Sequence, residues 1–328
     1  MIVRHLAYWL NCRDWKLVAM KIVILDDIDL TEDQHRQLAE LGAVVKHDDN
    51  PSDDAEIIKR LEGADIAVLG WTSLGPDVFA RLPQLRLVSV WATGYDYVDI
   101  SAARKHGVVV TNVPAYAGRA VAELTLGMIF ALARHVVWAD RSVRDGAFAW
   151  RGFRGFELVG KTLGLIGVGD IGREVARLAQ CLGMRVITHA RRMTPERAET
   201  LGVDFVPFST LLCESDVISL HVPLTEATRL LMGASEFAQM KATAYLINTC
   251  RAGLVDQPAL VAALRRDQLA GAALDDIDFP DDTLTVLPNV IITPHIGFYT
   301  DEALVRKGDV CVRNVAAFVA GNPANVVT

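Results

Sequence analysis

Short apolar runs alternate with amphipathic stretches along the first third of the chain. Such runs lie at 22–25, 43–45, 66–69, 85–90 and 108–110. Between them, stretches such as 53–61 place apolar residues on one face of a helix, and the stretch after the first run stops at Gly42. Buried strands that alternate with helices are typical of a parallel sheet with right-handed crossovers. The pattern therefore predicts a doubly wound α/β unit that closes near residue 110.

The rest of the chain predicts a second unit and a final helix. A helical pattern runs from about 119 to 144, and a second series of strands and helices extends from Lys161 to about Ile296. A last helical pattern, roughly 300–320, follows this series, so we expect it to pack back on the first unit. The predicted organisation is an N-terminal extension (1–20), a discontinuous first domain (21–117 and 299–328) and an inserted second domain (118–298).

Length and composition fit a two-domain globular protein. The chain has 328 residues, of which 51% are apolar and 22% charged. Its 33 basic and 40 acidic residues give a net charge of −7 with no basic block, which argues against nucleic-acid and membrane partners. The longest apolar stretch, 121–139, contains Glu123, Arg134 and His135, so we expect a buried helix and no membrane span.

The cysteines argue against a disulfide framework. There are five, widely scattered, at positions 12, 181, 213, 250 and 311. Their odd number and the lack of C-x-x-C spacing also give no indication of structural zinc, and no His, Asp or Glu cluster has metal-ligand spacing. We therefore expect a reducing, cytoplasmic location and no metal.

A glycine-rich motif opens the second unit. It directly follows the apolar strand 162–166 and precedes a helical pattern, which is the context that G-x-G-x-x-G requires. Gly167 would allow the tight turn, Gly169 the approach of a pyrophosphate, and Gly172 close helix packing. The residues expected to bind a dinucleotide here are Gly167, Gly169, Asp170, Ile171 and Gly172. The inserted domain is accordingly predicted to be a dinucleotide-binding Rossmann domain.

The next strand, 185–189, carries the signal for the type of dinucleotide. An Asp or Glu is expected about 20 residues after the glycines to hold the ribose of NAD, but this strand ends in Ala190, Arg191 and Arg192. Two guanidiniums suit a 2′-phosphate, so NADP(H) is the expected cofactor and NAD(H) the second choice. The alternative is that both arginines are solvated surface charges.

Polar residues follow three later strands of this series. Arg251, Asp275 and His295 each come just past the end of an apolar run, where ligand crevices open in parallel sheets. A 2-oxo acid needs a cation for its carboxylate, an acid to protonate its oxygen, and an anion to keep that acid protonated. A lone Arg or His is more often structural, but three such strand ends behind one dinucleotide motif favour catalysis.

Together these motifs resemble those of the D-isomer-specific 2-hydroxyacid dehydrogenase family, over nearly all of 21–325. Its marks here are Ala92-Thr93-Gly94-Tyr95-Asp96-Tyr97-Val98-Asp99, Asn112-Val113-Pro114, Val121-Ala122-Glu123, the glycine motif, His221-Val222-Pro223-Leu224-Thr225, Asn248 to Asp256 and Pro294-His295-Ile296-Gly297. The sequences of these motifs are most similar to those of glycerate dehydrogenase and glyoxylate/hydroxypyruvate reductase members. The fold class expected is α/β, with two doubly wound parallel-sheet domains: a Rossmann domain inserted into a flavodoxin-like substrate domain.

The resemblance also implies roles for single residues. Arg251 would clamp the substrate carboxylate and His295 would exchange the proton. The substrate would further contact Thr93, Gly94 and Tyr95. Additional cofactor contacts would come from His221, Val222, Pro223, Thr249, Cys250 and Asp275, with Asp275 near the nicotinamide amide. Finally, the family implies a homodimer that pairs through the long helix after residue 118.

One departure from the family concerns the anion beside His295. The family's Asp-Val-Phe-x-x-Glu-Pro segment is shortened here to 275–280, and no glutamate stands at the expected place. We expect Asp278 to replace it as a catalytic residue, with Asp276 as the second choice. A nucleophilic Cys250 beside Arg251 is a minor alternative, and His221 is expected to line the cofactor groove instead of acting as a base.

The leading hypothesis is therefore an oxidoreductase that moves a hydride between NADP(H) or NAD(H) and a small D-2-hydroxy or 2-oxo acid, with glyoxylate or hydroxypyruvate as the expected substrate. Two alternatives remain open. The same scaffold serves in corepressor-like proteins that sense dinucleotides, and in enzymes that oxidise formate or phosphite. Intact Arg251 and His295 favour the enzyme.

Overall fold

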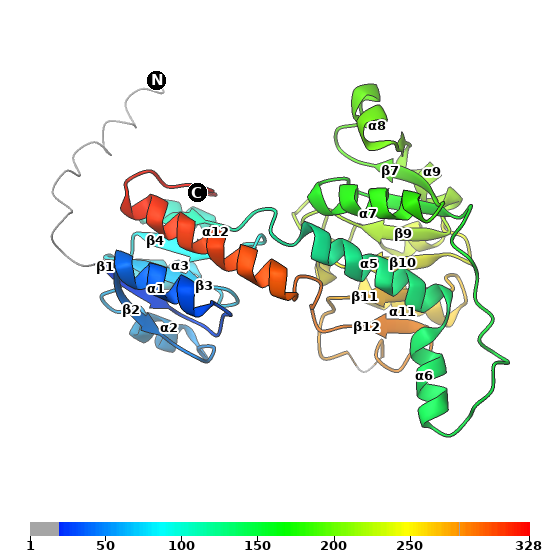
Figure 1. Cartoon of the computed structure of the whole chain (residues 1–328), viewed down its shortest axis with the longest axis horizontal. Coiled ribbons are helices and arrows are strands. Elements are labelled where there is room, and N and C mark those ends of the chain that lie inside the picture. Colours follow the sequence, from blue (N-terminus) through cyan, green and yellow to red (C-terminus); the bar gives the residue numbers. More distant parts are fainter. Residues whose placement is uncertain (1–19, 282) are drawn as a thin grey trace. The chain divides into compact units, whose positions relative to one another are not determined.

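The computed structural model describes residues 20–281 and 283–328. The expected N-terminal extension thus lies outside the described residues, apart from Met20. The chain divides into two compact units (Figure 1): residues up to Tyr116 together with Asp301–Thr328, and Ala117–Thr300. Each limit is within two residues of the boundary expected from the sequence.

The first unit is built on a five-stranded parallel sheet of order β2-β1-β3-β4-β5. Its strands are β1 (Met20–Ile24), β2 (Gly42–Lys46), β3 (Ile66–Leu69), β4 (Leu87–Val90) and β5 (Val109–Thr111). β3, β4 and β5 are buried along their whole length, which explains their continuous apolar runs. This strand order is the flavodoxin-like one, as predicted.

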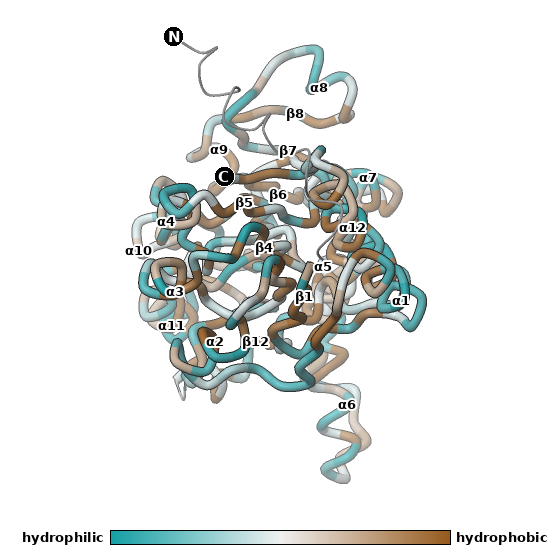
Figure 2. Tube along the Cα trace, turned by 90° about the vertical axis from the view of Figure 1, so that its left-hand side faces the viewer, coloured by the Kyte–Doolittle hydropathy of each residue, from teal (hydrophilic) through white to brown (hydrophobic). Residues whose placement is uncertain are grey.

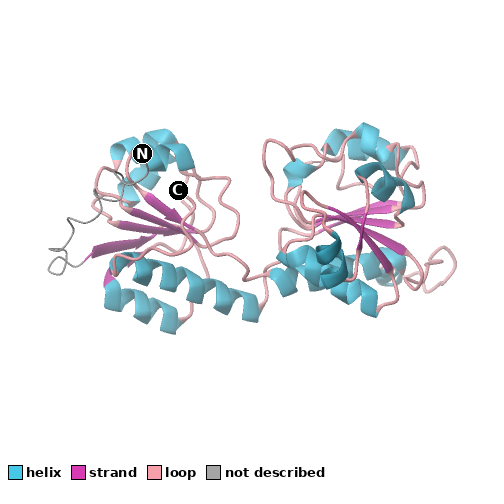
Figure 3. Cartoon of the chain, turned by 90° about the horizontal axis from the view of Figure 1, so that it is seen from above, coloured by secondary structure: helices cyan, strands magenta, loops and turns pink. Residues whose placement is uncertain are grey.

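Helices cover both faces of this sheet (Figure 3). They are α1 (Glu32–Leu41), α2 (Asp54–Arg60), α3 (Pro76–Arg81), α4 (Ile100–Lys105) and α12 (Asp301–Val319). Ile57 of α2, Phe79 of α3 and Ala103 of α4 share one buried cluster with the strands. The last helix, α12, packs on α1 and β4, so the C-terminal segment does return to the first unit.

The second unit has a seven-stranded parallel sheet of order β12-β11-β10-β9-β6-β7-β8. Its strands are β6 (Thr162–Ile166), β7 (Arg185–His189), β8 (Asp204–Phe205), β9 (Val217–Leu220), β10 (Tyr245–Asn248), β11 (Gly271–Leu274) and β12 (Val290–Ile292). Counted from β6, the order is that of a Rossmann domain with one further strand, as predicted.

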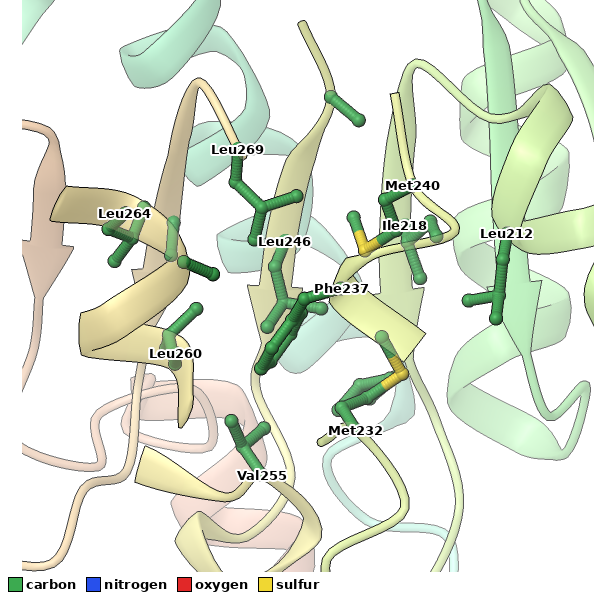
Figure 4. Close-up of a cluster of buried hydrophobic side chains, with 14 of the residues drawn as sticks. Leu212, Ile218, Met232, Phe237, Met240, Leu246, Val255, Leu260, Leu264 and Leu269 are labelled. Carbon is green, nitrogen blue, oxygen red and sulfur yellow. The ribbon is translucent and has the colours of Figure 1, made fainter. Parts of the chain in front are cut away.

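Helices flank the sheet of this unit, and all but two of them contain buried residues. They are α5 (Gly118–Ala133), α6 (Val136–Arg144), α7 (Asp170–Cys181), α8 (Pro195–Leu201), α9 (Phe208–Glu214), α10 (Ala234–Phe237), the 3₁₀ helix η2 (Ala252–Leu254) and α11 (Gln257–Arg265). On one side of β9 and β10, Phe237 is surrounded by leucine and methionine side chains such as Leu246 and Met232 (Figure 4). This core fixes the strands whose ends carry the candidate site.

The single helical segment expected over 119–144 is in fact two helices. His135 adopts a left-handed backbone, with φ 53°, and α5 and α6 meet at an angle of 62°. The amide of Phe156 bonds the carbonyl of Ala133, so the last turn of α5 is held by a distant segment instead of by a continuing helix. Among the described residues, no single helix is long and apolar enough to cross a membrane.

Candidate active site

The glycine motif forms the turn between β6 and α7. Gly167 has φ 94°, and a Cβ there would lie 2.3 Å from the carbonyl oxygen of His221. A Cβ on Gly172 would lie 2.4 Å from the carbonyl oxygen of Gly167. At Gly169, by contrast, a Cβ would meet no described atom within 4 Å, and no side chain caps the helix that begins there. The first turn of α7, with Asp170 and Ile171, thus offers an open cradle that fits a pyrophosphate.

His221 lies beneath this turn. Its side chain is buried, and its Nε2 is 2.9 Å from the Ser219 hydroxyl. Burial lowers the pKa of His221 to about 3, so the ring is neutral at physiological pH. The neutral ring is thereby excluded as a base, while the expectation that His221, Val222 and Pro223 line a cofactor groove stays a prediction.

A hollow of about 520 Å³ opens beside Val168. Its lining includes three arginines, Arg173, Arg192 and Arg197, and one carboxylate, Glu196. Arg197 donates to the carbonyls of Val168 (2.7 Å) and Arg192 (2.7 Å), which ties the hollow to the glycine turn. Arg191 and Arg192 are both exposed, but only Arg192 lines this hollow.

The segment after β10 presents Arg251. The buried Asn248 side chain accepts from the amide of Cys250 (3.0 Å) and donates to the carbonyl of Arg251 (2.8 Å), which folds the chain back at the strand end. The Thr249 hydroxyl lies 3.0 Å from that of Thr125 in α5. Sequence reasoning counted Asn248 only as part of a motif and did not identify it as the residue that shapes this turn.

Cys250 is not activated. Its thiol donates to the carbonyl of Leu220 (3.0 Å), and burial raises its pKa to about 12. The thiolate required for a nucleophile is therefore absent at neutral pH. This excludes the alternative in which Cys250 attacks the substrate.

Asp275, at the end of β11, holds the loop that carries His295. Its buried carboxylate accepts from the Thr293 hydroxyl (2.5 Å) and from the amides of Ile296 (2.8 Å) and Gly297 (2.7 Å). His295 itself sits in a left-handed conformation, with φ 56°, which few side chains adopt without such support. Asp275 is thus a positioning residue for His295, a role that the resemblance did not indicate.

The carboxylate beside His295 is that of Asp276, and the expectation of Asp278 is corrected. His295 Nδ1 lies 3.7 Å from Asp276 Oδ2, and the same oxygen accepts from the amide of Ala252 (3.1 Å). Burial raises the pKa of Asp276, but the contacts with His295 and Ala252 and the charge of Arg251 outweigh it and hold the pKa below its usual range. The carboxylate is therefore ionised. It lies next to His295 and to the turn that carries Arg251.

The geometry of the shortened segment explains the correction. Successive side chains of an extended chain point in opposite directions. Asp275 therefore faces the loop after β12 while Asp276 faces the loop after β10. Asp278 is exposed, and both its amide (2.9 Å) and its carbonyl (3.2 Å) are bonded by the Gln257 side chain of α11. This anchor keeps Asp278 at the surface.

The predicted substrate contacts lie in the first unit, in the segment after β4. Thr93 and Tyr95 are exposed there, and Gly94 lies between them. The Thr93 hydroxyl donates to the carbonyl of Val113 (2.6 Å), and the Asn112 side chain donates to the carbonyl of Thr93 (2.8 Å). Within the described residues, no group of three His, Cys, Asp or Glu side chains could hold a metal ion.

Comparison with known proteins agrees with this architecture. Residues 126–297 match the D-isomer specific 2-hydroxyacid dehydrogenase, NAD binding domain. A glycerate dehydrogenase of Methylorubrum extorquens is 40% identical over 284 residues, covering 83% of this chain and 88% of its own. A glyoxylate reductase of Korarchaeum cryptofilum is 39% identical over 290 residues, covering 85% and 87%.

A solved structure extends the likeness to the whole described fold. An acyclic imino acid reductase in complex with NADPH and D-Arg superimposes with a TM-score of 0.88 at 32% identity, covering 94% of this chain and 100% of that one. The match of both units, the glycine turn and the strand-end residues lead to one conclusion. The chain belongs to the D-isomer-specific 2-hydroxyacid dehydrogenase family.

Proposed function

We propose that the protein reduces a short 2-oxo acid, glyoxylate or hydroxypyruvate, to the D-2-hydroxy acid with NADPH. The observation that carries the proposal is the ionised Asp276 between His295 and the Arg251 turn, at the carboxyl edge of β10, β11 and β12. The relatives named glycerate dehydrogenase and glyoxylate reductase support this choice of substrate.

Three side chains have separate roles in the proposed reaction. A bound nicotinamide dinucleotide would supply the hydride to the carbonyl carbon. Arg251 binds the substrate carboxylate through its forked guanidinium and polarises the adjacent carbonyl. His295 donates the proton to the carbonyl oxygen from Nε2, because its Nδ1 faces Asp276. Asp276 stabilises the imidazolium before the transfer, and the roles reverse when a hydroxy acid is oxidised.

The preference for NADP(H) over NAD(H) rests on the hollow beside Val168. Its lining has three guanidiniums and one carboxylate; Arg173 is paired with Asp170 (2.9 Å), so the excess positive charge suited to a 2′-phosphate comes from Arg192 and Arg197. Ala190, at the end of β7, has no side-chain acceptor for a ribose hydroxyl. The imino acid reductase was solved with NADPH, in line with the same choice.

We also propose a homodimer that forms through α6 and the segment after it. Figures 1 and 2 show α6 projecting from the rest of its unit, and none of its residues is buried. Phe148 is 93% exposed and Trp150 80% exposed. Two large aromatic side chains exposed this close together in the sequence indicate an interaction surface. Sedimentation should give twice the chain mass, and charged substitutions at both positions should give monomers. A monomeric unmodified protein would refute the dimer.

A substrate panel tests the activity. NADPH oxidation is measured with glyoxylate, hydroxypyruvate, pyruvate and 2-oxobutyrate, and reduction of NAD and NADP is measured with formate and phosphite. Turnover of the first two acids is expected. Dinucleotide binding without any turnover would favour the corepressor-like alternative, and turnover of formate or phosphite alone would replace the substrate class. The cytoplasmic location stays a prediction, consistent with the free Cys181, Cys213, Cys250 and Cys311.

A further inference from the structure

Lys307 of α12 is a buried lysine that the proposed mechanism does not use. Its side chain is only 1% exposed, which is unusual for a residue with a charged end. The ammonium lies 3.4 Å from the centroid of the Trp91 ring, 5.2 Å from that of Tyr116 and 5.3 Å from that of Trp71. All three distances are within the range of cation–π attraction. We call these three rings the aromatic cage of Lys307.

The cage is made by segments that follow three strands of the first sheet. Trp71 comes shortly after β3, Trp91 directly after β4, and Tyr116 five residues after β5. Ligand crevices in such sheets open at the carboxyl ends of the strands. The proposed substrate contacts Thr93 and Gly94 follow Trp91 by two and three residues. Lys307 therefore lies at the base of the segment that presents them.

Backbone bonds connect this segment with the one that carries Tyr116. The amide of Val113 bonds the carbonyl of Ala92 (2.9 Å), and the Thr93 hydroxyl bonds the carbonyl of Val113. Trp91 is fully buried, yet its Nε1 has no hydrogen-bond partner among the described residues. The indole is thus positioned through its ring face, on which the Lys307 ammonium lies, and not through its N–H.

Several charged or titratable groups surround the ammonium. Asp26 and Asp29 follow β1, and Asp26 also accepts the amide of Trp71 (2.9 Å), which ties that cage segment to β1. Cys311 lies one turn further along α12, and Arg306 donates to the carbonyl of Tyr116 (3.0 Å). Burial lowers the pKa of Lys307 to about 7, although Cys311, Asp29 and Asp26 raise it. We therefore expect the charge of Lys307 to respond to pH near neutrality.

We propose that Lys307 is a positioning residue for the acid substrate: its ammonium, seated on the face of Trp91, holds the 91–94 segment in the conformation that presents the substrate-binding amides. This inference rests on the proposed function, since it assumes that Thr93 and Gly94 contact the 2-oxo acid. When Lys307 loses its proton, the attraction to the rings is lost and the segment loosens. Binding of the acid, but not of the dinucleotide, then weakens as the pH rises through 7.

The test compares Lys307→Met and Lys307→Arg with the unmodified enzyme between pH 6 and pH 9. The measured quantity is KM for the 2-oxo acid in the unmodified enzyme divided by KM in the Arg variant. This ratio should rise about three- to tenfold across the pH range, because lysine loses its charge and arginine keeps it. The Met variant should show the high KM at every pH, with kcat within about threefold and an unchanged KM for NADPH. The Arg variant should restore the low KM.

A second readout does not depend on turnover. The indole emission of the unmodified protein should titrate with a midpoint near pH 7, and this component should disappear in Trp91→Phe and in Lys307→Met. An unchanged titration in both variants would overturn the cation–π contact. An acid KM that is the same in all three proteins, or a parallel rise in both KM values, would overturn the positioning role. Absence of any 2-oxo acid turnover would instead refute the proposed function, and the emission titration would still decide on the cage.

Discussion

The two parallel sheets place different chemistry at their carboxyl ends. In the second unit, β10, β11 and β12 are followed by Arg251, Asp276 and His295, and Asp276 contacts both His295 and the amide of Ala252, next to Arg251. In the first unit, three strands are followed by segments that carry aromatic rings, and the ammonium of Lys307, from α12, lies against these rings. Under the proposed function, the second unit supplies the proton transfer and the cation that binds the substrate carboxylate, and the first unit adds further contacts to the acid. Two doubly wound parallel sheets thus support different roles through the residues that follow their strands.

Removing the cation of the second sheet should have the largest effect. Arg251→Ala is expected to lower kcat/KM about 10³-fold, because a forked, charge-assisted contact holds the carboxylate in the ground and transition states. Arg251→Lys, the matched control, should recover part of the loss, since it keeps the charge without the fork. Dinucleotide binding, followed by fluorescence, should not change. Kinetics near those of the unmodified enzyme would remove Arg251 from the site.

Loss of the proton donor should come next. His295→Asn is expected to lower kcat at least about 10²-fold with little change in KM, as is typical when a general acid is removed. His221→Asn serves as the comparison, because His221 is neutral and lies beneath the glycine turn. Its loss should raise KM for the dinucleotide more than it lowers kcat. If kcat of the His295 variant stays within a few-fold, another group supplies the proton.

Substitution of Asp276, the carboxylate beside His295, should have a smaller effect, and Asp278 provides a direct comparison. Asp276→Asn should lower kcat roughly 10- to 100-fold, the value of a charge-assisted contact of ~1.5 to 3 kcal/mol. Because the imidazolium loses its neighbouring anion, reduction should also require a lower pH. Asp278→Asn is the matched control and should change neither kcat nor the pH profile, since that side chain is exposed. The reverse result would restore Asp278 as the partner.

The smallest effect concerns the cofactor. Arg192→Ala should reduce the ratio of kcat/KM for NADPH to that for NADH about three- to tenfold, mainly through KM for NADPH, because an exposed charge contributes modestly. Arg191→Ala should have less effect, since only Arg192 lines the hollow. High salt should lower the ratio of the unmodified enzyme. Equal use of both dinucleotides at low salt would show that the arginines do not bind a phosphate.

Much of the fold and part of the candidate site could be predicted from the sequence, because they depend on local sequence patterns. Apolar runs predicted both sheets, and strand and helix around the glycines predicted the cradle at Gly169. What could not be predicted depends on contacts between distant segments. At the break near His135, the carbonyl of Ala133 is bonded by the amide of Phe156, from a later segment. The choice of Asp276 over Asp278 follows from the Gln257 anchor, and the cage of Lys307 joins segments that no local pattern relates.

The central claim is that this enzyme transfers a hydride to the carbonyl carbon of a 2-oxo acid and so forms a D-hydroxy acid. The most direct measurement uses hydroxypyruvate and NADPH deuterated at the reactive C4 position, with the product analysed by chiral chromatography and mass spectrometry. We predict D-glycerate that carries one deuterium at C2, and loss of this product in Arg251→Ala. L-glycerate, unlabelled glycerate, or no product from a protein that binds NADPH would contradict the account.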